Sequence, residues 1–538
     1  MKLNSVVLAA LPLVLSVPAS AQLAPVIDAS FDDWDTIPVV AIDAAGDAIG
    51  AFDVTELRAV GMGSELYLRF DTNTERNLVS GRFTDGDWII TIGLPGTDLV
   101  IDYRERSARR DGGVSWNDIR FVTLPTYASD EFEVRVDLGA FGIGQGDTVS
   151  VQFSGSDSLT APASVIMGSP AAAPVSTQLE KPVGADLRVA SLNTLSTGLF
   201  SASRGDELAR LIDAVDADIY CFQEEYSSNA PLIRGLLEGI DPLDNGLPWN
   251  VVHNGSDEVI ASQYPLDVVT SGTSAAAGGL VRLSDTEGLL VFSVHHKCCG
   301  NILSSEDATR IGQSNAIADT IADFRAAALG GSLSPFADAG IVVIGDWNLV
   351  GSREPLDVLL DPRTPDMVLS TPINAGGNDA ATWRDLDGFG FPPGVLDLIT
   401  FSGDRLTELN SYALDTELLT SAELASLGLE QSDSTIASDH KLLVLDLALG
   451  AGMVACPADL TTTGATLPAQ AGYGQPDGTA DLDDLGFFIA NWLANDVIAD
   501  LTTSGATLAG QQGFGASDGV IDLDDLGYFL GVWLAGCP

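Results

Sequence analysis

Hydrophobic and polar residues alternate differently in successive parts of this 538-residue chain. From about Gln22 to Gly168, short runs alternate with a period of two, and Gly, Asp and Asn separate them. Strands that bury one face have this pattern, so residues 22–168 are predicted to form an antiparallel β-sandwich. The clearest runs are Glu65–Phe70, Trp88–Ile92, Asp98–Tyr103, Glu131–Asp137 and Thr148–Phe153.

A second pattern begins at about residue 185 and continues to about residue 450. Here short apolar strands such as Leu187–Ala190 alternate with helical stretches such as Arg204–Val215, which predicts an α/β domain. Residues 169–184 precede this domain and contain three Pro, several Ala and little periodicity. That composition is typical of a linker.

The last segment, residues 456–538, contains an internal duplication. Asp459-Leu-Thr-Thr-Thr-Gly-Ala-Thr-Leu recurs 41 residues later as Asp500-Leu-Thr-Thr-Ser-Gly-Ala-Thr-Leu, which indicates paired units. In each unit an acidic loop precedes an amphipathic helix, and its spacing of Asp-Gly and later carboxylates fits half of an EF-hand-like calcium loop. A helical hairpin with solvated acidic turns is the alternative. The expected Ca²⁺ ligands are Asp459, Asp477, Asp481, Asp484, Asp500, Asp518, Asp522 and Asp525.

The first residues predict export. Lys2 precedes a short apolar run from Val6 to Val17, and Ala19-Ser-Ala21 offers a small-residue cleavage site. Residues 1–21 are therefore expected to be a secretory signal, and the protein to be secreted or attached to the cell surface. With 25 Lys and Arg against 75 Asp and Glu, the net charge of −50 disfavours non-specific binding of nucleic acid by the whole molecule. It does not exclude a nuclease, because a local cationic patch and a divalent metal reverse the sign inside a cleft.

The chain has five cysteines, and export permits an even number of them to pair. Cys456 and Cys537 bracket the last segment and are the disulfide candidates. Cys221 lies in an apolar strand and is expected to be an inert core thiol. The neighbours Cys298 and Cys299 form either a vicinal disulfide or two free thiols, and both alternatives stay open.

Candidate chemistry is concentrated at the ends of the apolar strands in residues 185–450. The strand Ile341–Ile344 ends at Gly345, and Asp346-Trp-Asn348 follows. Each such polar group alone is as typical of a turn or a solvated surface. Asp397 is different, because a carboxylate between apolar neighbours within a strand needs a buried partner, and a histidine suits it. Similar stretches carry Asn193, Glu224, His295-His296-Lys297, Asp397 and Ser438-Asp439-His440.

Together these groups predict a metal-assisted hydrolase. Carboxylate and amide oxygens suit Mg²⁺ or Mn²⁺, and the chain has no Cys/His set with zinc spacing. A buried Asp bonded to an imidazole fixes the tautomer of the ring and raises its basicity. A carboxylate near the metal is suited to take a proton from the attacking water.

The order of these motifs resembles the endonuclease/exonuclease/phosphatase superfamily, which includes DNase I-like nucleases, apurinic endonucleases, sphingomyelinases and inositol polyphosphate 5-phosphatases. The resemblance covers Leu187 to Leu447 and includes the Gly-Asp-x-Asn and Ser-Asp-His motifs. It implies a four-layer α/β sandwich, two packed mixed sheets flanked by helices, with the site at one edge. It also implies hydrolysis by in-line attack of an activated water on phosphorus.

The resemblance further implies a metal and a water position. Glu224 would be the principal metal ligand, with Asn193 and Asp439 close to the metal and the phosphate. Asp346 would activate or orient the attacking water. Asn348 would position that water and the phosphate.

The histidines receive roles in the same way. His440, held by Asp397, would bind the phosphate and stabilise its developing charge. His295 would donate to a phosphate oxygen, although its neighbour His296 leaves open which of the two rings faces the cleft. The sequence departs from the family pattern at Val395, where relatives have Arg, and at Leu398, where they have Tyr.

Two cations are candidates for substrate binding. Thr382-Trp-Arg384 resembles a stretch of some secreted bacterial relatives, and Lys297 follows the two histidines. Arg384 and Lys297 are therefore expected to contact the phosphate or its neighbours. Ordinary surface charge is the alternative for each.

Two weaker resemblances concern the flanking segments. Ile27–Trp34 and Ser129–Leu138 are similar to family-nine-like carbohydrate-binding and DOMON-type sandwich modules, which implies a glycan partner; a purely structural sandwich fits equally well. The duplicated segment and its final Gly536-Cys537 resemble type I dockerins, which implies Ca²⁺ and an anchoring partner.

The sequence thus predicts a secreted phosphodiesterase dependent on Mg²⁺ or Mn²⁺. Its substrate would be a nucleic acid or a phospholipid head group, and phosphomonoesters stay open. An inactive glycan-binding surface protein and a calcium-dependent scaffold or anchoring protein are the alternatives. Retention of all the strand-end groups argues against the inactive protein.

Overall fold

A computed structural model provides the fold. It describes residues 23–50, 52–78, 88–171, 177–243, 245–364, 366–386 and 388–449. In the C-terminal segment it describes residues 458, 460–461, 470, 482–494, 497–499, 501–505 and 519–535. The expected signal at residues 1–21 lies outside these ranges. Within the described part of the chain, no helix is long and apolar enough to span a bilayer.

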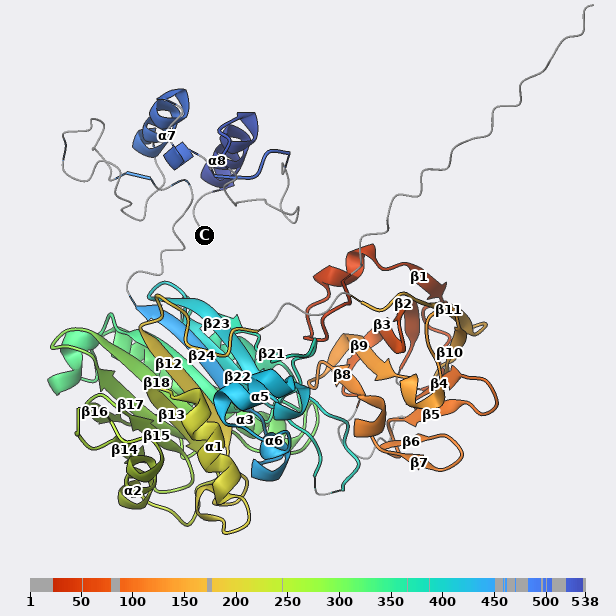
Figure 1. The fold of residues 1–538 in the computed structure, drawn as a ribbon, viewed down its shortest axis with the longest axis horizontal. Coiled ribbons are helices and arrows are strands. Elements are labelled where there is room, and N and C mark those ends of the chain that lie inside the picture. Colours follow the sequence, from red (N-terminus) through yellow and green to blue (C-terminus); the bar gives the residue numbers. More distant parts are fainter. Residues whose placement is uncertain are drawn as a thin grey trace, which may run out of the picture. The chain divides into compact units, whose positions relative to one another are not determined.

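The chain forms two compact units, of which unit 1 contains the N-terminal part up to Ser176. Its strands form one sheet in the order β7-β6-β5-β4-β10-β11-β2-β3-β9-β8, with β1 on β2 (Figure 1). Both halves of this sheet bury side chains in one core, including Leu66, Ile90 and Val151. The strands are β1 (Val39–Ile42), β2 (Val54–Met62), β3 (Glu65–Arg76), β4 (Trp88–Gly93), β5 (Leu99–Asp102), β6 (Ser107–Arg109), β7 (Gly113–Val114), β8 (Val122–Leu124), β9 (Ser129–Asp137), β10 (Thr148–Gly155) and β11 (Ala163–Gly168).

Two features of unit 1 differ from the expectation. The pairing of β2 with β11 is parallel, so the sheet is not purely antiparallel. Unit 1 also includes the later segments Gly376–Ala381 and Asp385–Gly394, which the sequence had placed in the α/β domain. Buried polar contacts within unit 1 explain this: Arg135 forms an ion pair with Asp379 at 2.8 Å.

Unit 2 contains two mixed sheets that pack face to face. The first has the order β14-β15-β13-β12-β24-β23-β21 and the second β16-β17-β18-β19-β22-β20. Their facing side chains form one apolar core, with Val189 and Leu445 from the first sheet and Val342 and Ile399 from the second. The strands are β12 (Leu187–Asn193), β13 (Ile219–Gln223), β14 (Asn250–His253), β15 (Val259–Ser262), β16 (Leu266–Val269), β17 (Ala276–Arg282), β18 (Gly288–His295), β19 (Gly340–Asp346), β20 (Met367–Ser370), β21 (Ile373–Asn374), β22 (Asp397–Ser402), β23 (Leu406–Leu414) and β24 (Leu442–Leu449).

Helices cover the first sheet on its other face. Leu211 and Ile212 of one helix and Ile233 of a second share a core with Tyr220 and Val444 of the sheet. A long helix buries its own apolar residues and packs against a short one that follows β19. The helices are α1 (Gly205–Val215), α2 (Ala230–Ile240), α3 (Ser305–Arg325), α4 (Glu354–Leu359), α5 (Ser421–Leu427) and α6 (Asp433–Ala437). This arrangement is an α/β sandwich, in agreement with the sequence.

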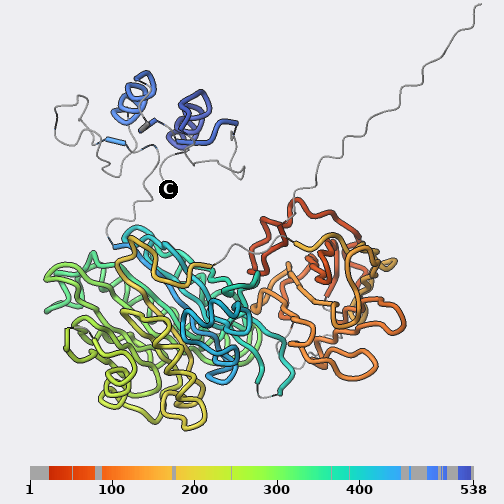
Figure 2. Tube along the Cα trace, in the orientation of Figure 1, coloured from red at the N-terminus to blue at the C-terminus, as the bar shows by residue number. Residues whose placement is uncertain are grey.

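The two central strands of the first sheet come from distant parts of the sequence. β12 and β24, from opposite ends of the unit 2 sequence, lie side by side and antiparallel (Figure 2). A buried ion pair joins them, because Arg188 Nε and Nη2 donate to the two oxygens of Asp446 at 2.7 and 2.9 Å. Both side chains are almost fully buried, so each charge depends on the other.

Strand direction brings the polar strand ends together. β12 and β13 are parallel, with Asn193 opposite Gln223, and both end at the same edge of the first sheet. In the second sheet β18 and β19 are parallel, with His295 opposite Asp346. β22 runs antiparallel to β19 and begins at Asp397 opposite Asp346. The ends of these strands therefore meet at one edge of the sandwich, as open α/β sheets generally arrange them.

The duplicated C-terminal segment repeats its contacts as well as its sequence. α7 (Leu482–Ala494) and α8 (Leu523–Ala535) pack through Phe488 and Phe529, whose rings stack at 4.2 Å. Asp484 accepts backbone N–H groups from Leu460 and Thr461, and Asp525 does the same for Leu501 and Thr502. Each partner lies 41 residues after its counterpart, so the two units fold alike.

Candidate active site

One carboxylate oxygen lies at the centre of the strand-end groups. Asp346 Oδ2 accepts hydrogen bonds from Asn348 Nδ2 at 2.9 Å and from Asn193 Nδ2 at 3.1 Å. The Nε2 atoms of His295 and His440 lie 3.6 and 3.8 Å from the same oxygen. Burial raises the pKa of Asp346 to about 6, although the two imidazoles act against this. The structure thus brings the expected catalytic groups together around Asp346.

Gly345 explains how the two sheets approach each other at this point. Its φ of 140° lies in a region that favours glycine. A Cβ atom there would lie 2.3 Å from Val294 O and 3.0 Å from Gln223 Nε2, which belongs to the other sheet. Gln223 Nε2 donates to Ser191 Oγ and Ser293 Oγ, so it links the sheets beneath the site. A side chain at position 345 would push this amide away.

Glu224 is held in a strained conformation immediately after β13. Its φ is 63°, which is costly for a residue with a side chain and is often found at functional sites. Its Oε1 accepts from Asn193 Nδ2 at 3.2 Å, and its Oε2 accepts from the backbone N–H of Ser196 at 2.8 Å. The Asn193 amide therefore links Glu224 to Asp346. The side chain of Glu224 remains 20% exposed, so it is open to a ligand.

His440 has the carboxylate partner that the sequence predicted. Its Nδ1 lies 2.9 and 3.1 Å from the two oxygens of Asp397, and both side chains are buried. Burial alone would lower the pKa of His440, but the charges of Asp397 and Asp346 raise it to about 10. At neutral pH the ring is therefore a cation, and its Nε2 faces Asp346 as an ion pair at 3.8 Å.

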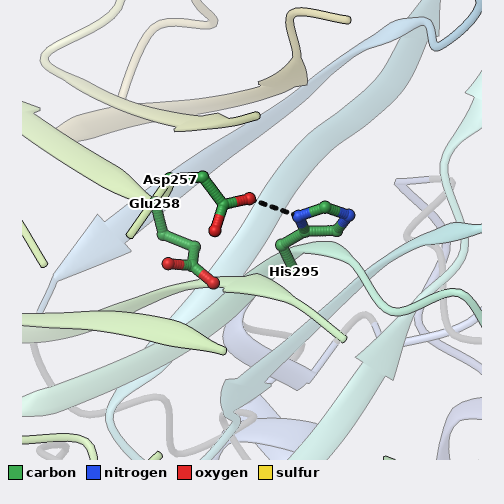
Figure 3. A group of neighbouring side chains, drawn as sticks. All are labelled: Asp257, Glu258 and His295. Atoms are coloured by element: carbon green, nitrogen blue, oxygen red, sulfur yellow. Dashed lines mark hydrogen bonds and ion pairs between the residues drawn. The ribbon is translucent and has the colours of Figure 1, made fainter. Parts of the chain in front are cut away.

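His295 has a carboxylate partner that the sequence analysis missed. Figure 3 shows Asp257 beside its ring, and Asp257 Oδ2 lies 2.5 Å from His295 Nδ1. Burial would lower the pKa of His295, but the bond to Asp257 and the charge of Asp346 raise it to about 9. Burial raises the pKa of the neighbouring Glu258 to about 8, and the charge of Asp257 contributes. His295 is thus a second protonated ring facing Asp346.

His296 points away from the site, which settles the alternative left open by the sequence. Its side chain is buried, and neither ring nitrogen has a hydrogen-bond partner among the described residues. It packs edge-on against Trp347, with ring centroids 5.3 Å apart. Burial lowers its pKa to about 3, so the ring is neutral. His295 alone of the pair faces Asp346.

Ser438 and Asp439 form a turn that is tied to the end of β12. Ser438 Oγ donates to Asn193 O at 2.7 Å. Asp439 Oδ2 accepts from Trp383 Nε1 at 3.0 Å, and among the described residues its second oxygen has a long contact of 3.4 Å from Ser438 Oγ. Arg204 reaches the same region, because its Nη1 donates to Thr194 O and to Ala437 O. Arg204 is a positioning residue that no sequence motif indicated.

Arg384 supports this turn from beneath. Its backbone N–H donates to Asp439 O at 2.9 Å. The guanidinium is buried and forms ion pairs with Asp415 at 3.1 Å and with Glu417 at 2.5 Å. Lys441 also pairs with Asp415, at 3.0 Å. The expected contact of Arg384 with substrate does not fit this placement, because its charge is neutralised inside the fold.

Lys297, the other expected cation, is exposed beyond the two histidines. Its backbone is fixed, because its N–H donates to Gln313 and its carbonyl accepts from Arg310 Nη1 at 2.8 Å. The adjacent Cys298 and Cys299 are free thiols. Of the two alternatives left open by the sequence, the structure therefore has two free thiols and no vicinal disulfide. Cys221 is a buried free thiol, as expected.

The donor set fits a hard divalent cation. Carboxylate and imidazole atoms lie within 4.8 Å of one another in two groups, one around Asp346 and His440 and one around Asp257 and His295. Beside them, Glu224 offers a partly exposed carboxylate next to the Asn193 amide. Oxygen-rich acidic sites of this kind suit Mg²⁺ or Mn²⁺. Glu224 would hold the ion, with Asn193 and Asp439 as the further candidates.

The expected calcium ligands at the C-terminus are only partly described. Asp459, Asp477, Asp481, Asp500 and Asp518 lie outside the described residues. Asp484 and Asp525 use Oδ1 to accept two backbone N–H groups each, as given above. Asp522 Oδ1 accepts from Asp524 N at 2.8 Å. Calcium binding by this segment stays a prediction, as does a disulfide between Cys456 and Cys537, which also lie outside the described residues.

The α/β domain that contains this site is similar to known proteins. Residues 190–440 match the model of the Endonuclease/Exonuclease/phosphatase family. The chain matches no curated protein. Since the matched residues contain the site, this domain is a hydrolase that acts on phosphoesters, as the sequence predicted.

Several solved structures are similar to about half of this chain. D. rerio TDP2 complexed with a single-strand DNA product has 14% identity, covers 48% of this chain and 98% of its own, and has a TM-score of 0.32. A Bacteroides thetaiotaomicron mannosyl-6-phosphatase has 16% identity, coverage of 49% and 99%, and a TM-score of 0.31. An AP endonuclease from Leishmania major has 10% identity, coverage of 49% and 87%, and a TM-score of 0.33.

The Asp257 contact generates a first prediction. Asp257→Asn removes the charge that holds His295 protonated and in one tautomer, so kcat should fall roughly 10²- to 10⁴-fold while KM changes little. Steady-state kinetics on a chromogenic phosphoester measure this. Glu258→Gln is the matched control, because Glu258 lies beside Asp257 but has no bond to the ring, and it should lose less than about tenfold. Equal losses in the two variants would contradict the assignment.

The Asp415 network generates a second prediction, on stability. Burial alone would raise the pKa of Asp415, but Lys441 and Arg384 lower it to about 2. Because the folded pKa lies below the unfolded value, Asp415 contributes stability at neutral pH that is lost as pH falls from about 4 to about 2. Asp415→Asn should therefore cost at least about 2 kcal/mol at pH 7 and progressively less below pH 4.

Denaturant unfolding at several pH values measures this difference. Asp338→Asn is the control, because the Asp338 side chain is 92% exposed and its loss should change stability little at any pH. A deficit of Asp415→Asn that stays constant from pH 7 to pH 3 would show that Asp415 does not pair as described.

Proposed function

We propose that this protein is an exported phosphodiesterase that requires a divalent metal, Mg²⁺ or Mn²⁺. The observation that carries the proposal is the position of Asp346 between two protonated imidazoles, each held by its own carboxylate. Export rests on the apolar run and small residues of the first 21 positions.

The two imidazoles supply the donors that a phosphate needs. With pKa values of about 9 and about 10, His295 and His440 are both protonated at neutral pH. Their Nε2 atoms converge on the same point beside Asp346 and are positioned to donate to phosphoryl oxygens. Donors fixed in advance stabilise the charge that develops in the transition state, and such groups contribute about 10²- to 10³-fold each.

Asp346 is placed to handle the proton of the attacking water. Its pKa of about 6 is close to the pH at which a general base works best. Asn348 donates to both of its oxygens, through the backbone N–H and Nδ2, so the carboxylate has one fixed orientation. The Asn193 amide also donates to Oδ2. A water accepted by Asp346 would attack phosphorus in line with the leaving group.

The acidic side chains that line the site are candidate ligands of the metal ion. Glu224 would hold the ion, assisted by Asn193 and Asp439. When bound, the cation neutralises negative charge on the phosphoryl oxygens and favours ionisation of water.

The charges near the site favour a diester over a monoester. Among the described residues around the site, Arg204 and Arg310 donate to backbone carbonyls and Arg384 pairs with carboxylates. Within the site, two imidazolium groups and one divalent cation face at least as many carboxylate charges, and Lys297 lies exposed beyond the histidines, so the site offers little excess positive charge to a dianion. A phosphodiester carries one charge, whereas a monoester carries nearly two at neutral pH. Nucleic acids and phospholipid head groups both offer such diesters.

Hydrolysis of bis(p-nitrophenyl) phosphate tests the proposal. The purified protein should hydrolyse this diester faster than p-nitrophenyl phosphate, lose activity with EDTA and regain it with Mg²⁺ or Mn²⁺. Asp346→Asn and His440→Ala should each lower kcat by about 10²- to 10⁴-fold, because each removes a group that acts on the reacting atoms. Asp338→Asn is the matched control and should retain full activity, since its side chain is 92% exposed.

Either of two results would overturn this function. One is activity that survives both chelation and Asp346→Asn. The other is faster hydrolysis of the monoester than of the diester, which would contradict the proposed specificity for diesters. Parallel assays with DNA, RNA and sphingomyelin then separate nucleic-acid from phospholipid substrates. A glycan partner for unit 1 and an anchoring partner for the C-terminal segment stay predictions from the sequence.

A further inference from the structure

A second acidic cluster lies in unit 1, which contains none of the groups around Asp346. Asp43 follows β1, Asp47 lies in the loop between β1 and β2, and Asp157 follows β10. Each offers a carboxylate oxygen, and these three oxygens lie within 4.8 Å of one another. Residues more than a hundred positions apart in the sequence thus meet at one end of the sheet.

Hydrogen bonds hold two of these carboxylates in place. Asp157 Oδ2 accepts from Val54 N at 2.8 Å, and its Oδ1 accepts from Ser158 N at 2.7 Å. Asp43 Oδ1 accepts from Thr160 Oγ1 at 2.9 Å. The backbone also joins the two loops, because Ile49 N donates to Ser156 O at 2.8 Å. Two of the three carboxylates are therefore held in place, and the cluster combines side chains from two loops.

Two buried carboxylate oxygens near the β1–β2 loop have no partner among the described residues, and one of them belongs to the cluster. Asp43 is only 9% exposed, and its Oδ2 is buried without a hydrogen bond. Asp53 is 7% exposed; its Oδ2 accepts from Gly46 N in the same loop, and its Oδ1 is also buried without a hydrogen bond. A buried carboxylate oxygen with no donor costs free energy, so such atoms are usually satisfied.

A positive charge would be a suitable partner for the carboxylates of this cluster. Burial raises the pKa of Asp157, and the negative charges of Asp43 and Asp47 raise it further. Asp47 is exposed, so the cluster opens to solvent on one side. Three carboxylates, of which Asp47 is exposed and the other two are buried, would repel one another unless a cation lies between them.

We propose that Asp43, Asp47 and Asp157 bind a calcium ion. All the available ligands are oxygens on loops, and Ca²⁺ accepts six to eight oxygens in variable geometry, whereas Mg²⁺ demands a near-ideal octahedron and keeps its waters. The ion would satisfy Asp43 Oδ2 and join the loop after β1 to the loop after β10. This site is independent of the proposed phosphodiesterase activity and of the C-terminal repeats.

Calcium binding by the full-length protein tests this site. Equilibrium dialysis against Ca²⁺ counts bound ions for the wild type, Asp47→Asn, Asp157→Asn and the control Asp98→Asn. Asp98 is an exposed aspartate in the β4–β5 loop of the same unit. Other Ca²⁺ sites in the chain contribute equally to all four proteins, so only the differences between them count. Hydrogen exchange of residues 43–50 and 155–160, with and without Ca²⁺, localises the ion.

The wild type and Asp98→Asn should each bind one more Ca²⁺ than Asp47→Asn and Asp157→Asn. Ca²⁺ should slow exchange in both loops at least tenfold in the first two proteins and leave it unchanged in the others. Without Ca²⁺, Asp47→Asn should unfold at the same temperature as the wild type or higher, because it removes repulsion. Asp47 is exposed, so its variant decides the question even where Asp157→Asn fails to fold. Equal Ca²⁺ counts for Asp47→Asn and wild type would overturn the proposal.

Discussion

The arrangement of the active site depends on a single buried oxygen, Asp346 Oδ2. Two amides donate to it and two imidazoles face it, so four nitrogen-bearing side chains from separate strand ends converge on one atom. A carboxylate with this burial is stable only with such partners. The same contacts raise the pKa of both rings, because each ring lies between Asp346 and a second carboxylate. Packing and electrostatics therefore depend on each other here.

The fold makes this convergence possible through strand direction and one glycine. Parallel pairs end together at one edge of each sheet, and antiparallel β22 and β24 begin there. Because the sheets pack face to face, the two sets of ends become neighbours. Gly345 then allows the amide of Gln223 to approach between the sheets. Buried ion pairs of Arg384 and Asp415 support the turn before β24 from within. Apolar packing sets the distance between the sheets, and these polar contacts set the position of each side chain.

Much of this site could be predicted from the sequence, for a physical reason. A polar residue after an apolar strand lies at a sheet edge, so Asn193, Glu224 and Asp346 were predictable as neighbours. Asp397 was predictable as a buried partner of a histidine, because apolar residues flank it in the sequence, although it is the first residue of β22 and not inside the strand. Asp257 was not, since a carboxylate in a Gly-Ser-Asp-Glu loop resembles any turn and only the fold places it at His295. The burial of Arg384 also depends on distant Asp415. The two adjacent histidines could not be separated either, because only the strand's orientation shows which ring is buried.

Histidine NMR tests the central claim most directly, because the chain contains only four histidines. In metal-free protein labelled at the histidine ring carbon, chemical shifts report the charge of each ring as pH is raised. Two rings should remain protonated at pH 7 and titrate near pH 9 and pH 10, and His296 should stay neutral down to about pH 3. Asp346→Asn should lower both high midpoints together, because both rings face the same carboxylate. Titration of His295 and His440 near pH 6.5, unaffected by Asp346→Asn, would contradict the account.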